Sequence, residues 1–129
     1  PEARKYAKIE YGSIRKRKVD VERIAKNTGY SKEQIHEIKN YLFIDKHNLG
    51  SRFTRFDPSF EIAQSWNRLM NGNIESHDLT LIKHEIYEKE LISSGMSQDD
   101  AHKESSKIYN YQKEAEEYYD SLKKRKKRK

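Results

Sequence analysis

Apolar residues recur every three or four positions along most of the chain, which is the period of an α-helix that buries one face. Signals for β-strands are weak, because the one stretch rich in strand-forming residues, Tyr41–Ile44, continues a helical pattern. The pattern predicts an all-α fold in a single compact domain of about five to seven helices. The domain is expected to cover residues 1–122 and to end in a disordered basic tail, residues 123–129.

Turn and capping residues divide this pattern into separate helices. Asp20 is expected to cap a helix that Gly29 ends, and Ser31 begins a capping box for the next helix. Asp57 is expected to cap a helix that has Pro58 in its first turn. Residues 45–57 are predicted to form a loop, and later helices are predicted over about residues 78–94, 97–109 and 111–122.

Residues 21–44 have the spacing of a helix-turn-helix hairpin. Ala25 is small enough for two helices to cross closely, Gly29 permits a left-handed turn, and Ile35 supplies an apolar residue of the second helix. In a DNA-binding hairpin, the second helix would present Lys32 and its polar neighbours to a groove or to phosphates. A plain helical hairpin has the same spacing, so both interpretations stay open.

The predicted helix over residues 78–94 carries titratable residues inside an apolar surface. At about 100° per residue, His84, Glu85 and Glu88 fall within a stripe of apolar side chains. His84 and Glu88 are four positions apart and share a helical face. A carboxylate beside a histidine can orient the ring and raise its pKa, which suits general acid–base catalysis. The alternative is a solvated ion pair on a surface helix.

The next predicted helix places His102 and Tyr109 on one face. If it folds back on the preceding helix, so that residues 77–109 form a helix pair, His84 and His102 can face each other. Such a pair, with a tyrosine or a basic residue, suffices for metal-independent RNA cleavage. One group deprotonates the ribose 2′-hydroxyl, another protonates the leaving 5′-oxygen, and a cation stabilises the phosphorane. The alternative is an exposed histidine and a packed tyrosine. The catalytic candidates are therefore His84, Glu85, Glu88, His102 and Tyr109.

Arginine and phenylalanine alternate in the predicted loop. Arg52 and Arg55 flank Phe53, and this combination suits phosphate contact with base stacking. The alternative is a loop that its phenylalanines anchor, with both arginines solvated. The candidate nucleic-acid contacts of the chain are Lys32, His47, Arg52, Arg55 and Lys83.

Charge is distributed unevenly along the chain, whose formal net charge is +6. Residues 1–57 hold 14 Lys/Arg against 8 Asp/Glu, residues 58–122 hold 6 against 13, and all of residues 123–129 are basic. Basic ends attract phosphate, whereas the acidic middle repels it unless its carboxylates have a specific role. There is no cysteine, which excludes disulfides and thiolate chemistry. No apolar run approaches the roughly 18 residues of a membrane span.

A metal site is the alternative use of the same histidines. The segment His84-Glu85-x-x-Glu88 differs at one position from the HExxH zinc motif, and His84, Glu88 and His102 could supply three ligands. The spacing is not diagnostic, so the sequence favours no metal and no cofactor.

The stretch from Asn40 to Tyr111 resembles the C-terminal domains of bacterial polymorphic toxins. The matching segments are Phe43–Leu49, Arg55–Asp57 with Ala63–Trp66, His77–Glu85 with Glu88, and Ala101-His102 with Tyr109–Tyr111. Such domains lie at the ends of large secreted or phage-head-associated proteins. The resemblance implies a nuclease-type toxin that is delivered into the cytoplasm of a competing cell and neutralised by a cognate immunity protein. The start at Pro1 agrees with a fragment of a longer carrier.

The sequence therefore favours a metal-independent ribonuclease toxin that acts on tRNA or another structured RNA. Two alternatives remain open: a metal-dependent DNase toxin, and a non-enzymatic helix-turn-helix module that binds DNA through residues 21–42. The acidic second half of the chain argues against the DNA-binding module, since carboxylates beside DNA weaken binding.

Overall fold

The computed structural model describes residues 2–128, which form seven α-helices, one π-helical turn and a minimal two-stranded hairpin. The predicted all-α fold is confirmed. By its internal contacts the chain divides into two compact units, Pro1–Glu75 and Ser76–Lys129. The elements are α1 (Glu2–Lys16), α2 (Asp20–Thr28), α3 (Lys32–Lys39), η1 (Asn40–Ile44), β1 (His47–Asn48), β2 (Phe53–Thr54), α4 (Phe60–Asn71), α5 (Ser76–Ser93), α6 (Gln98–Ile108) and α7 (Tyr111–Arg128).

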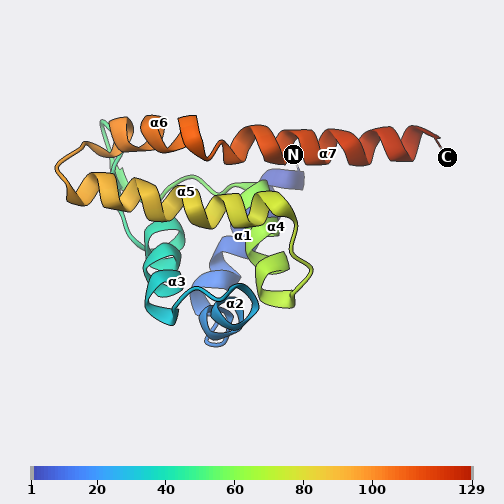
Figure 1. Cartoon of the computed structure of the whole chain (residues 1–129), viewed down its shortest axis with the longest axis horizontal. Coiled ribbons are helices and arrows are strands. Elements are labelled where there is room, and N and C mark those ends of the chain that lie inside the picture. Colours follow the sequence, from blue (N-terminus) through green and yellow to red (C-terminus); the bar gives the residue numbers. More distant parts are fainter. Residues whose placement is uncertain (1, 129) are drawn as a thin grey trace. The chain divides into compact units, whose positions relative to one another are not determined.

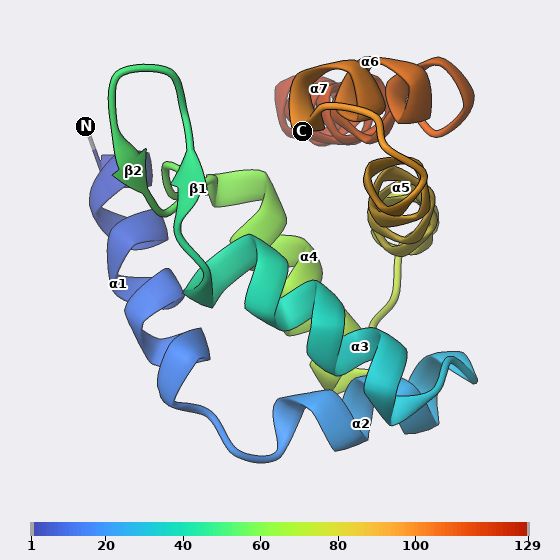
Figure 2. The same ribbon diagram turned by 90° about the vertical axis from the view of Figure 1, so that its left-hand side faces the viewer.

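The first unit packs its helices around an aromatic core. Helix α2 contacts α3 and α4, and α1 contacts α4 and η1 (Figure 2). Phe43 is fully buried, and its ring meets Tyr11 and Trp66 edge-on at centroid distances of 4.7 and 5.1 Å. The apolar stripe of the predicted hairpin, including Ile35 and Ile38, is also buried. The helical period of the apolar residues therefore identified the helix faces that point into the core of this unit.

The hairpin of α2 and α3 has the predicted turn chemistry. Gly29 ends α2 with a left-handed φ of 85°, and its N–H donates to the Ala25 carbonyl at 2.9 Å. Ser31 and Gln34 form the capping box of α3, in which the Ser31 hydroxyl accepts from the Gln34 amide at 3.1 Å. The predicted helical hairpin is thus confirmed, whereas its use in DNA binding stays a prediction.

The two aspartates expected to cap helices do not do so. Val19 holds the cap position of α2, and Asp20 is the first residue of the helix. Asp20 is fully buried, and its carboxylate accepts from the Val21 amide at 3.0 Å, from Lys39 Nζ at 2.9 Å and from Trp66 Nε1 at 3.0 Å. Ser59, not Asp57, caps α4 by accepting from the Ile62 amide at 3.2 Å. A residue before proline favours extended backbone, so helix α4 starts only after Asp57-Pro58.

The segment between η1 and α4 is mostly irregular, as predicted, but it contains a short antiparallel pairing. His47 pairs with Thr54 and Asn48 with Phe53, and Gly50 turns the chain with a φ of 84°. The loop leaves the end of the α3–η1 segment that is remote from α2 (Figure 2).

In the second unit, α6 and α7 run one after the other back along α5 (Figure 1). Gly95, with a φ of 110°, lies in the turn between α5 and α6. The basic segment expected to be a disordered tail continues α7 as far as Arg128. Lysine and arginine are good helix formers, and cations suit a helix C-terminus. Within the described residues, no helix combines the length and apolar character that crossing a bilayer requires.

Candidate functional site

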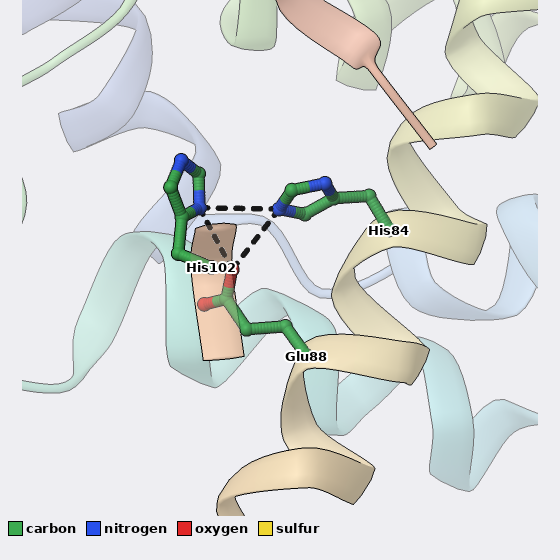
Figure 3. Close-up of side chains that lie close together, drawn as sticks. All are labelled: His84, Glu88 and His102. Atoms are coloured by element: carbon green, nitrogen blue, oxygen red, sulfur yellow. Dashed lines mark hydrogen bonds and ion pairs between the residues drawn. The ribbon is translucent and has the colours of Figure 1, made fainter. Parts of the chain in front are cut away.

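Three of the candidate catalytic side chains meet in the second unit: His84 and Glu88 from α5, and His102 from α6. Glu88 Oε1 lies 3.0 Å from His84 Nε2 and 2.8 Å from His102 Nδ1, and the two ring nitrogens are 3.2 Å apart. Figure 3 shows the three side chains pointing toward one another. The convergence expected from the helical faces is confirmed, and we call this group the His–Glu–His cluster.

The close packing of α5 and α6 produces this convergence. Ala101 and Ser105 on α6 are fully buried and small, so the two helices can approach closely. The Ser105 hydroxyl also donates to the backbone carbonyl of His84 at 2.8 Å. This bond fixes the register of α6 against α5 at the level of the cluster, and therefore places His102 opposite His84 and Glu88.

A backbone carbonyl orients the ring of His84. His84 Nδ1 lies 3.0 Å from the carbonyl oxygen of Tyr109, just beyond the end of α6. Because a carbonyl oxygen only accepts, Nδ1 carries a proton and Nε2 faces the cluster. Tyr109 was expected to act through its phenol, but the contact that it makes with His84 comes from its main chain.

The cluster is buried on the α5 side and open on the α6 side. The side chains of His84 and Glu88 are 5% and 3% exposed, whereas that of His102 is 61% exposed. Its hydrogen bond to Glu88 raises the pKa of His102; partial burial opposes this, and the charges of Glu88 and Asp99 add to it. A small ligand can thus approach the cluster from the side of His102.

A second carboxyl group lies next to the cluster. Glu85 Oε1 is 4.0 Å from His84 Nε2, and Glu85 Oε2 is buried with no hydrogen-bond partner among the described residues. Burial raises the pKa of Glu85 well above its usual range, and the charge of Glu88 raises it further, against an opposing effect of Lys89. A buried polar oxygen without a partner is costly, so Glu85 requires a specific explanation.

The candidate nucleic-acid contacts are distributed between the two units. Lys83 is exposed on α5, in the same unit as the cluster. The other four belong to the first unit, where Arg52 is exposed and Arg55 donates through Nε to the Ile44 carbonyl at 3.0 Å. Lys32 pairs with Glu22 at 3.6 Å on the surface.

The remaining loop candidate, His47, serves the packing of the loop. Its Nε2 lies 2.8 Å from the Tyr41 carbonyl, and its ring stacks on Phe56 at a centroid distance of 4.1 Å. These contacts favour a structural role for His47 over phosphate binding, because its polar and aromatic faces are already engaged within the loop.

Chemically, the cluster offers two nitrogen atoms and one oxygen atom, all within reach of a single ligand atom. It can transfer protons, since imidazoles beside a carboxylate are suited to that task, or it can hold a cation. Ser105 and the Tyr109 carbonyl, which support this arrangement, were not among the sequence candidates. Comparison of the chain with known protein families, curated proteins and solved structures finds no match.

Proposed function

We propose that this chain is a nuclease-type toxin domain that cleaves RNA at the His–Glu–His cluster. The observation that carries the proposal is the meeting of two imidazoles and a carboxylate at a position open to solvent on one side. The net charge of +6 favours a polyanionic substrate. The resemblance to polymorphic toxin domains supports a nuclease-type toxin, and the paired histidines with the basic ends of the chain favour RNA, with tRNA as the favoured class.

In the acid–base form of this reaction, the side chains of the cluster have distinct roles. His84 accepts the proton of the ribose 2′-hydroxyl at Nε2, because its Nδ1 is held by the Tyr109 carbonyl. The 2′-oxygen forms a bond to phosphorus as the bond from phosphorus to the 5′-oxygen breaks. His102, exposed and with a raised pKa, donates a proton to that 5′-oxygen. Glu88 orients both rings.

The biological setting that follows is interbacterial competition. The domain would be delivered as the C-terminal part of a larger bacterial protein and would act in the cytoplasm of the target cell. A cognate immunity protein would cover the cluster, with acidic groups placed against Arg52 and Arg55, both of which are exposed.

The first test is an RNA digest with a matched pair of histidine variants. His102→Ala is expected to lower the rate of cleavage of total RNA by about 10²-fold, because water replaces an exposed general acid only poorly. The control is His36→Ala, which removes an exposed histidine on α3. RNA that stays intact at high concentrations of the wild-type chain, with and without added divalent metal, would refute the proposal.

Tyr109→Phe tests whether the phenol takes part. Since the contact with His84 comes from the main-chain carbonyl, this substitution is expected to leave the cleavage rate essentially unchanged. A loss as large as that of His102→Ala would assign a catalytic role to the hydroxyl.

The second candidate function is a metal-dependent DNase. The specific observation in its favour is the short separation of the three cluster atoms, which matches the spacing of ligand atoms around one metal ion. Nicking of plasmid DNA that requires added metal would select it. The helix-turn-helix module has less support, since α3 exposes Glu33 and Glu37 beside Lys32 and His36.

A further inference from the structure

We propose that His84 Nε2, Glu88 Oε1 and His102 Nδ1 bind one divalent transition-metal ion of the zinc class, with Glu85 beside it as a partner of metal-bound water. This proposal goes beyond the proposed cleavage of RNA, because it concerns what the site binds and does not depend on the substrate. An ion on His84 Nε2 occupies the lone pair that the acid–base form of the reaction uses, so the loaded site would act in the metal-dependent form.

The cluster holds too few protons to satisfy its three atoms. His84 Nδ1 donates to a carbonyl, so neutral His84 presents a lone pair at Nε2, only 3.0 Å from the carboxylate oxygen of Glu88. His102 Nδ1 carries one proton at most and lies 2.8 Å from that oxygen and 3.2 Å from His84 Nε2. Within the cluster, these three atoms in mutual contact therefore share one hydrogen atom. A second proton, on His84 Nε2, would donate to Glu88 Oε1 but would lie against the Nδ1–H of His102, whose nitrogen is 3.2 Å away. A divalent cation satisfies all three atoms at once.

The distances within the cluster fit the ligand atoms of one metal ion. Ligand atoms about 2.0–2.2 Å from a zinc ion, with angles of about 90–110° between them, lie about 3.0–3.5 Å from one another. The three sides of the cluster measure 2.8, 3.0 and 3.2 Å, so they need to expand only slightly. All candidate ligand atoms in this group lie within 4.8 Å of one another.

Main-chain contacts around the cluster hold His84 in position. Histidines that bind metals usually donate their second ring N–H to a carbonyl or carboxylate, which fixes the tautomer, and His84 does this with Tyr109. Ser105 fixes the backbone of His84 through its carbonyl. These contacts hold the lone pair of Nε2 toward the other two ligands before any ion binds.

Glu85 gives an independent observation. Its buried Oε2 has no hydrogen-bond partner within the described part of the chain, although its Oε1 lies 4.0 Å from His84 Nε2. A water molecule on the metal would supply a donor for this carboxyl group. In the HExxH arrangement, the glutamate that follows the first histidine has this relation to the metal-bound water, and Glu85 follows His84 in the same way.

The donor set defines the class of ion. Two imidazoles with one carboxylate suit zinc and neighbouring transition metals, whereas magnesium and calcium prefer oxygen ligands. Three protein ligands with one open side are typical of catalytic rather than closed structural sites. The exposed side of His102 provides this opening.

The test is titration calorimetry of the full chain, stripped of metal by a chelator, with zinc chloride in the absence of RNA. One equivalent of zinc is expected to bind, and Glu88→Gln and His102→Ala are each expected to weaken binding by at least about 100-fold. The controls are Glu90→Gln and His36→Ala, which change exposed residues outside the cluster. Magnesium chloride is expected to give no saturable heat.

Circular dichroism of each variant establishes that it is folded, and the visible spectrum of the cobalt-loaded wild-type chain reports nitrogen ligands independently of any variant. Absence of saturable zinc binding, or equal binding by the wild type and His102→Ala, would overturn the metal site. Zinc binding without RNA cleavage would keep the metal site and refute the ribonuclease. RNA cleavage in EDTA by a chain that does not bind zinc would refute the metal site and keep the ribonuclease.

Discussion

Glu88→Gln is expected to reduce RNA cleavage by about 10³-fold, the largest effect of any single substitution in the cluster. Glu88 Oε1 contacts both imidazoles, at 3.0 Å from His84 Nε2 and 2.8 Å from His102 Nδ1. Glutamine preserves the shape of the side chain but removes its negative charge. Without that charge, the hydrogen bond no longer raises the pKa of His102 as a carboxylate does, and a metal ion would lose its anionic ligand. The effect is therefore expected in both the acid–base and the metal-dependent form of the reaction.

The measurement is the initial rate of cleavage of a labelled structured RNA, with Glu90→Gln as the control. Glu90 is exposed on the same helix, so the control makes the same chemical change away from the cluster. Since Glu88 is buried, thermal unfolding of both variants should accompany the rates. A folded Glu88→Gln chain that cleaves RNA at the wild-type rate would place the active site elsewhere.

Asp20→Ala is expected to lower the free energy of unfolding by about 3–5 kcal/mol, the cost of leaving a buried charge unpaired. Lys39 is 5% exposed and directs its ammonium group to the Asp20 carboxylate at 2.9 Å. The other oxygen of Asp20 accepts from the indole N–H of Trp66 at 3.0 Å. Removing the carboxylate leaves Lys39 with only the backbone carbonyl of Arg17 and leaves the indole without this acceptor.

Urea unfolding followed by fluorescence measures this loss directly, because Trp66 is the only tryptophan in the chain. The matched control is Glu22→Ala, which removes a carboxylate from the exposed pair with Lys32 and should change stability by less than about 1 kcal/mol. Equal unfolding midpoints for the two variants would show that the buried pair contributes no more than a surface pair.

The elements of the fold were predictable where they depend on local chemistry. The glycine turn at Gly29 and the capping box at Ser31 follow from interactions within a few residues, and both are confirmed. The role of Asp20 was missed because its side-chain partners, Lys39 and Trp66, are 19 and 46 positions away, whereas an N-cap has the same local sequence. Residues that form long-range polar contacts look like caps until the packing is known.

In the candidate site too, local pairings were predictable and long-range contacts were not. The pairing of His84 with Glu88 follows from helical periodicity. The position of His102 depends on how far α6 slides along α5, and Ser105 helps to set that register through a backbone carbonyl. Carbonyl acceptors have no signature in a sequence, so neither the Ser105 contact nor the Tyr109 contact could be predicted.

The main-chain acceptor at Tyr109 has an evolutionary consequence. Every residue carries a carbonyl, so the amino acid at this position can drift while the imidazole of His84 stays anchored. An insertion or deletion between His102 and Tyr109 is different, since each added or lost residue turns the following backbone by about 100°. Among descendants of this chain, the length of that segment should be preserved more strictly than the identity of its amino acids.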